Sequence, residues 1–320
     1  MKKTNIISAL LLGAISCNSM EPMSESAISK MNNIRRGKEA LNKTFFLAVQ
    51  RNQPKEVEKL IKEGANYSAK ENKTLRTAMH VAAEVGAVEI LFQLSSRDRR
   101  LLQQKDYEGN TPLHYAAAAG QVEAIEWLVR RCAHKNETNN VGLTPFMFCV
   151  VFKQMRAMFT LYKLEADIYA EDIFGESALH IAAATCGSFC KPLLEWGLKP
   201  NVRGNEDKTP LHYAAMRGDW LAIKALLDGK AYPNNLDRAC RTPLHYAAKK
   251  SDLAVDALLQ AGKNKVKLDV QDMDGNTPLH LSLTYGKVPA ALALIEAGSQ
   301  YKIKNKDGDT ARDLAERFKL

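Results

Sequence analysis

Two kinds of apolar stretch alternate along the chain, with short polar connections between them. The first kind is short and rich in alanine, as in Leu-His-Tyr-Ala-Ala at residues 113–117. The second kind is longer, as in residues 221–227, and this example ends at a turn that contains glycine. Polar Asp-x-x-Gly segments, such as residues 106–109, separate one pair of stretches from the next and are typical of tight turns. The pattern predicts two short helices per unit.

The first helix of each unit is expected to begin at a hydroxyl residue. The heptapeptide Thr-Pro-Leu-His-Tyr-Ala-Ala occurs unchanged at residues 111–117, 209–215 and 242–248. Its hydroxyl residue suits an N-cap and its proline suits the first helical position. Degraded copies extend the series at steps of 32 to 35 residues, with first residues Thr44, Thr77, Thr111, Thr144, Ser177, Thr209, Thr242, Thr277 and Thr310. This period predicts a solenoid in which each unit buries its apolar face on the next.

The period, the heptapeptide and the Asp-x-x-Gly turn together resemble the ankyrin repeat. The resemblance covers residues 37–320 and implies an all-α repeat solenoid of stacked helix-turn-helix units with short β-hairpin loops. It divides the solenoid into a capping unit at residues 37–66, seven central repeats, and a truncated C-terminal cap at residues 305–320.

The first residues lie outside the repeat register. Lys2 and Lys3 precede an apolar run over residues 6–15, which is too short to span a bilayer and predicts a secretory signal peptide over residues 1–16. Residues 14–17 are similar to a bacterial lipobox, which implies acylation of Cys17, with ordinary signal cleavage as the alternative. Residues 17–36 are polar and predict a flexible tether. We therefore expect an exported, membrane-anchored lipoprotein of a bacterial envelope, or alternatively a secreted or periplasmic soluble protein.

The formal net charge of +9 and the pI near 9.1 invite a nucleic-acid interpretation. The export signal and the dispersion of the basic residues argue against it, because nucleic-acid surfaces combine clustered cations with stacking aromatics. A solvated basic surface that prefers an acidic protein partner is favoured instead.

Six histidines occupy the fourth position of the repeat. One histidine per repeat spaces the rings by about 8–10 Å, while zinc needs several ligands at about 2 Å. We expect these side chains to be structural, with hydrogen bonds to the threonine hydroxyl or to the turn that links adjacent units, and we predict no metal. They are His80, His114, His180, His212, His245 and His280.

The cysteines and the remaining motifs indicate no catalysis. Without Cys17, five cysteines at irregular spacings make no disulfide framework, although a bridge between Cys186 and Cys190 stays open. No phosphate-binding glycine loop, Cys-x-x-Cys pair or nucleophile elbow occurs. The prediction is a non-enzyme with no cofactor and no small-molecule substrate.

The resemblance implies that a partner binds the concave face, formed by the hairpins and the ends of the first helices. By register, both apolar and basic residues map to this face. Simpler interpretations stay open for both groups: the apolar residues can fill a distorted core, and the basic residues can be ordinary solvated charges. The hypothesis is a scaffold for an acidic, partly apolar protein segment, either of a host protein or, alternatively, of the cell's own envelope proteins. The predicted contacts are Tyr107, Val151, Phe152, Ile173, Phe174, Arg217, Arg238, Arg241, Lys249 and Lys250.

Overall fold

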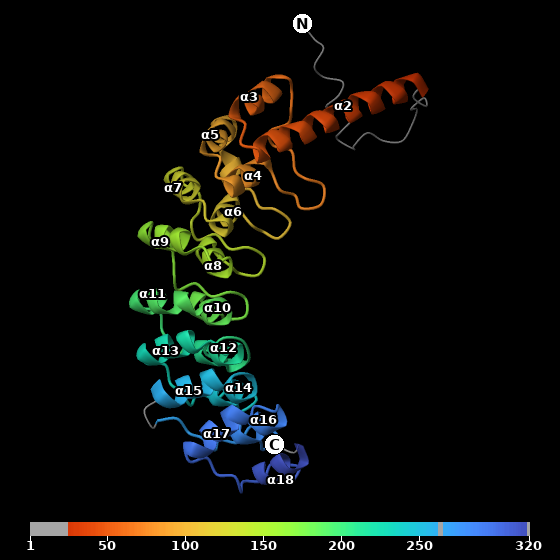
Figure 1. Ribbon diagram of the computed structural model, residues 1–320. Helices are drawn as coiled ribbons and strands as arrows, with labels where there is room; N and C mark the ends of the chain where they lie inside the picture. The colour runs from red at the N-terminus through yellow and green to blue at the C-terminus, as the bar shows by residue number, and fades with distance from the viewer. Residues whose placement is uncertain (1–24, 262–264, 319–320) are drawn as a thin grey trace, which may run out of the picture.

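Paired helices stack along one direction in the computed structural model, which describes residues 25–261 and 265–318 (Figure 1). The inner helix of each unit packs on the inner helix of the next. The inner helices are α2 (Glu25–Gln50), α4 (Ala78–Val85), α6 (Pro112–Ala119), α8 (Pro145–Val151), α10 (Ala178–Thr185), α12 (Pro210–Arg217), α14 (Pro243–Lys250), α16 (Pro278–Thr284) and α18 (Ala311–Phe318).

The outer helices form the second row of the stack. They are α3 (Pro54–Lys62), α5 (Val88–Arg97), α7 (Val122–Arg130), α9 (Met155–Lys163), α11 (Cys190–Glu195), α13 (Trp220–Asp228), α15 (Asp252–Ala261) and α17 (Val288–Glu296). Short 3-10 helices η1 (Arg99–Gln103), η2 (Gly187–Phe189) and η3 (Asn205–Asp207) lie in the connections. The stack is curved, with the inner helices on its concave side (Figure 1). The all-α repeat solenoid predicted from the sequence is confirmed.

Residues of the repeat determine where each inner helix begins and ends. In α6 the N-cap Thr111 has extended backbone, Pro112 follows at the first helical position, and Gly120 closes the helix in the left-handed conformation with φ 73°. The paired alanines Ala116 and Ala117 are fully buried, which lets neighbouring inner helices approach closely. A helix of two turns is unstable alone, so packing on both neighbours supplies its stability.

One continuous apolar core runs through the stack between the two rows of helices. In the unit of α6 and α7 it contains Leu113, Ile125 and Leu128, all with no exposed surface. The next unit substitutes bulkier side chains, and its Phe146 and Met147 are also fully buried. Because every unit contributes to the same core, the loss of one buried side chain weakens two interfaces.

The connections between units are turns rather than paired strands. Within the described ranges, only isolated antiparallel bridges occur, at Lys70–Thr77, Glu171–Ser177 and Lys304–Thr310, so the expected β-hairpin loops are reduced to single bridges. Asp106 shapes one such turn, since its Oδ1 accepts hydrogen bonds from the amides of Glu108 and Asn110 at 2.9 and 2.8 Å. We call these turns hairpins.

The structure describes only part of the N-terminal region for which the sequence makes predictions. Helix α2 begins at Glu25, so residues 25–36 are helical and the predicted flexible tether over residues 17–36 is wrong for that part. The predicted capping unit, which starts at residue 37, therefore begins inside a helix. The predicted signal peptide and Cys17 lie outside the described residues. Among the helices that the structure describes, none is both long and apolar enough to cross a membrane.

Candidate interaction surface

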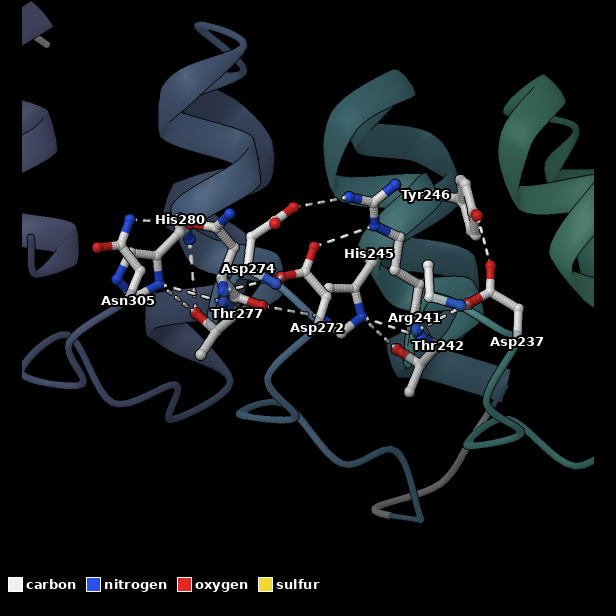
Figure 2. A network of polar contacts seen from close by, with 12 residues as sticks. Asp237, Arg241, Thr242, His245, Tyr246, Asp272, Asp274, Thr277, His280 and Asn305 are labelled. Atoms are coloured by element: carbon white, nitrogen blue, oxygen red, sulfur yellow. Dashed lines mark hydrogen bonds and ion pairs between the residues drawn. The ribbon is translucent and has the colours of Figure 1, made fainter. Parts of the chain in front are cut away.

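The repeat histidines bond each unit to the next. In the α14 unit, the amide of Thr242 donates to Nδ1 of His245 at 3.0 Å, and the Thr242 hydroxyl lies 2.9 Å from the same nitrogen (Figure 2). Because Nδ1 accepts, the proton is on Nε2, which donates to the carbonyl oxygen of Asn276 in the following unit at 3.1 Å. The ring is therefore a neutral link between two repeats.

The same pair of bonds recurs at all six positions, which we call the histidine ladder. The Nε2 acceptors are the carbonyl oxygens of Asn110 for His80, Leu143 for His114, Val202 and Lys208 for His180, Arg241 for His212, Asn276 for His245, and Asp309 for His280, at 3.0 to 3.2 Å. These histidines lie inside the stack, away from any partner surface. No three His, Cys, Asp or Glu side chains in the described ranges cluster closely enough to hold a metal ion.

Burial keeps five of the six rings uncharged. Desolvation lowers the pKa of His80, His114, His180 and His212 to about 4, and it lowers the pKa of His245 in the same direction. The hydrogen bond from Nε2 to the neighbouring carbonyl opposes this shift but does not cancel it. The rings of His80, His114, His180, His212 and His245 are therefore neutral at physiological pH.

Two of the predicted partner contacts are instead bound within the fold. Arg241 pairs through Nε with Asp272 at 3.0 Å and through Nη2 with Asp274 at 3.5 Å, both in the next hairpin (Figure 2). The Asp272 side chain is completely buried and that of Arg241 is 31% exposed, so this pair joins two units. Arg238 is exposed and pairs with Asp207 of the preceding hairpin at 3.3 Å. Both arginines are thus partly neutralised before any partner arrives.

The remaining predicted cations gather at the ends of two adjacent inner helices. Arg217 ends α12, Lys249 and Lys250 end α14, and all three side chains are exposed. None of them takes part in an ion pair with another described residue. The Lys249 ammonium lies 4.3 Å from the ring centroid of Tyr285, which follows α16.

Tyr285 is a surface residue that the sequence-based prediction missed. It stands eight positions after Thr277, as Phe152, Arg217 and Lys250 stand after the first residues of their own units. Register alone could therefore have found it. We call the exposed and half-exposed positions at this end of the inner helices from α6 to α16 the concave ridge: Ala118, Ala119, Val151, Phe152, Ala184, Thr185, Met216, Arg217, Lys249, Lys250, Thr284 and Tyr285.

The predicted apolar contacts divide between core and surface. Phe152 is 50% exposed at the end of α8, whereas the neighbouring Val151 is half-buried and packs against the core. Ile173 and Phe174 are 63% and 57% exposed at one hairpin tip, and Tyr107 is exposed at another. The distorted-core interpretation thus suits Val151, and the surface interpretation suits the four other side chains.

The two cysteines considered for a disulfide carry free thiols. Cys186 is half-buried, and its sulfur lies 3.2 Å from the Ser188 hydroxyl. Cys190 is fully buried, and burial raises the pKa of its thiol to about 12. Burial likewise raises the pKa of the Cys149 thiol. A thiol with a raised pKa is a poor nucleophile at neutral pH, so Cys149 and Cys190 have the properties of small core side chains.

Comparison with known proteins agrees with this architecture. The family model for ankyrin repeats (3 copies) matches overlapping segments at residues 45–140, 88–172, 146–237 and 221–307. The transient receptor potential cation channel subfamily A member 1 of Drosophila melanogaster is 31% identical over 272 residues, or 81% of this chain and 23% of the channel. The human channel of that name is 31% identical over 47% of this chain and 14% of its own length.

A second group of relatives has a different name. The neurogenic locus notch homolog protein 1 of Xenopus tropicalis is 31% identical over 48% of this chain, which covers 6% of that protein. The chain thus spans less than a quarter of the length of each of these relatives.

Proposed function

The chain belongs to the ankyrin-repeat family, and from that premise we propose that it is a non-catalytic scaffold that binds a protein partner on its concave face. The observation that carries the proposal is the concave ridge, where Phe152, Arg217 and Lys250 occupy one register position and are exposed. The repeat needs Thr, His and Ala at its packing positions, but the ridge needs no particular residue for stability. Large apolar and cationic side chains at such free positions are typical of binding hot spots.

The chemistry of the described residues supports the absence of catalysis. The six buried histidines bond one repeat to the next, and the buried Asp272 pairs with Arg241 of the preceding unit. The half-buried Tyr115, Tyr213 and Tyr246 hydroxyls donate to carboxylates of the hairpins, which serves turn structure. An enzyme would instead need polar groups that converge on an open site.

Affinity capture with matched variants tests the binding proposal. The full-length mature chain is compared with a variant in which Phe152 becomes Ser and Arg217 and Lys250 become Glu, and with a variant altered at the exposed outer-helix residues Arg156 and Lys224. Proteins bound through the concave face should be lost with the first variant and retained with the second. A set of bound proteins that is identical for all three chains would refute the proposal.

For location, we propose export and attachment to a bacterial envelope by a lipid on Cys17, with a secreted or periplasmic soluble form as the alternative. Support comes from residues 1–17 alone, where a basic start and an apolar run precede Ala-Ile-Ser-Cys. Mass spectrometry of the mature N-terminal peptide tests this proposal. A diacylglyceryl group on Cys17 is expected, and an unmodified residue at or near that position would contradict it.

The partner is proposed to be a host protein, with the cell's own envelope proteins as the second candidate. Exported repeats that bind host proteins must be accessible outside the cell, whereas an envelope adaptor need not be. Protease treatment of intact cells separates the two. Digestion of the chain supports the host partner, and full protection that is lost after the envelope is opened supports the adaptor.

A further inference from the structure

From α6 to α14 the concave ridge is divided into an uncharged half and a basic half. On α6, α8 and α10 the ridge carries alanine, threonine, Val151 and Phe152. On α12 and α14 the same positions carry Met216, Arg217 and two lysines. Phe152 therefore lies at the end of a helix whose two packed neighbours, α6 and α10, carry small ridge side chains, while the cations lie on the two inner helices that follow α10.

The hairpin tips repeat this division. Tyr107, Val141 and Ile173 are exposed apolar residues on three consecutive tips. These tips are joined by backbone hydrogen bonds, because the Asn140 amide donates to Glu108 at 2.9 Å and the Ile173 amide donates to Val141 at 3.2 Å. The apolar tips thus form one row on the units that also carry the uncharged half of the ridge.

Farther along, the hairpins are charged but internally paired. Arg238 pairs with Asp207, and Arg241 pairs with carboxylates of the next hairpin. These tips therefore offer a partner little net charge. The basic character of this half comes from the ridge itself.

Three cations of the ridge have no carboxylate partner among the described residues. Arg217, Lys249 and Lys250 lie on the packed helices α12 and α14. Lys250 passes close to the end of α12, since a Cβ atom added at Gly218 would lie 3.3 Å from the Lys250 Cγ. No carboxylate of the described residues offsets these three positive charges, so this part of the ridge attracts anions.

The spacing of packed helices gives the distance between Phe152 and the cations of the ridge. Neighbouring packed helices are about 8–10 Å apart, so Phe152 on α8 and Arg217 on α12 are about 16–20 Å apart, and Lys250 on α14 is about one step farther. An extended chain advances about 3.3 Å per residue, so these spans correspond to about five to nine residues.

We propose that the concave face binds an extended segment in which an apolar block and an acidic block are separated by about five to nine residues. The apolar block contacts Phe152 and the tips that carry Ile173 and Phe174, and the acidic block contacts Arg217, Lys249 and Lys250. Tyr285, next to Lys249, borders the acidic block. The inference deepens the proposed function and rests on it.

Selection from a displayed library of random 16-residue peptides on the immobilised full-length mature chain tests this proposal. Peptides that carry an apolar pair and an acidic pair at the stated separation should be enriched. A ridge variant with Arg217→Glu, Lys249→Glu and Lys250→Glu should bind those peptides about tenfold more weakly or worse, because three exposed charge contacts become repulsive. Its binding should also lose the salt dependence of the wild type.

A charge-matched control carries Arg156→Glu, Lys163→Glu and Lys224→Glu on the outer helices, where all three side chains are exposed. This control should keep the wild-type affinity, and thermal unfolding of all variants reports whether the stack is intact. Enrichment of peptides without acidic residues, or equal binding by the ridge variant, would overturn the inference and leave the scaffold function standing. Failure of the wild type to enrich any peptide would count against both.

Discussion

The histidine ladder predicts that the stack loses stability in mild acid. Desolvation lowers the pKa of His80, His114, His180 and His212 in the folded chain to about 4, from an ordinary value of 6.5. Between those two values the unfolded chain binds more protons than the folded chain. The free energy of unfolding therefore falls as the pH falls through 6.5, and it continues to fall until the folded pKa is reached.

The magnitude follows from the linkage relation. Each histidine contributes a slope of at most about 1.4 kcal/mol per pH unit in this window, so the four together give at most about 5.6 kcal/mol per pH unit if the stack unfolds as one unit. Between pH 6.5 and 5 each histidine should cost about 2 kcal/mol. Carboxyl groups titrate mainly below pH 5, so they contribute little to the pH dependence of the free energy of unfolding between pH 6.5 and 5. The histidines therefore dominate that dependence.

Urea denaturation followed by circular dichroism at pH 7, 6 and 5 measures this slope. The variant His212→Gln should show a shallower pH dependence than the wild type, because it removes one titrating ring of the ladder. His134→Gln is the matched control, since the His134 side chain is exposed and pairs with Glu137 of its own turn rather than with another repeat. Equal free energies of unfolding at pH 7 and pH 5 would refute the assignment of buried neutral rings.

Three further predictions concern stability at pH 7, each measured by urea denaturation. His212→Ala should cost about 1–3 kcal/mol, because the Thr209 amide and the Arg241 carbonyl are left unpaired, and an unchanged midpoint would contradict the ladder. Arg241→Met should lower the free energy of unfolding by about 2–4 kcal/mol, because it leaves a fully buried carboxylate unpaired. The control Arg238→Met should lower it by less than about 1 kcal/mol, and equal losses would argue against the buried pair. Gly109→Ala should lower the free energy of unfolding by about 1–3 kcal/mol, since φ of Gly109 is +81° and the added Cβ would lie 2.8 Å from the backbone of the next hairpin. An unchanged free energy of unfolding would show that the turn relaxes.

Much of the local architecture could be predicted from the sequence because its causes lie within one repeat. The N-cap at Thr111, the proline after it and the glycine at 120 each act within about one helical turn. His114 acts at the same short range through its bond to the Thr111 amide. The period then placed every copy in the stack.

Other features depended on contacts that no local pattern specifies. Residues 25–36 are mostly polar and predict a tether, yet they continue the helix of the first unit. Val151 and Phe152 are neighbours in an unusually apolar run, and only packing decides that the first faces the core and the second faces outward. Arg241 looks like one more surface cation until its partners, more than thirty residues away, are placed beside it.

The sequence by itself determined the repeat, the two helices of each unit, the structural role of the histidines and the register positions that face outward. These follow from short-range chemistry repeated at a constant period, and the stacking of identical units carries that chemistry along the chain. The tertiary structure decided which outward charges stay free. A charge is free or paired according to what the next repeat presents to it, so Arg217, Lys249 and Lys250 remain available while Arg241 is held by a buried carboxylate.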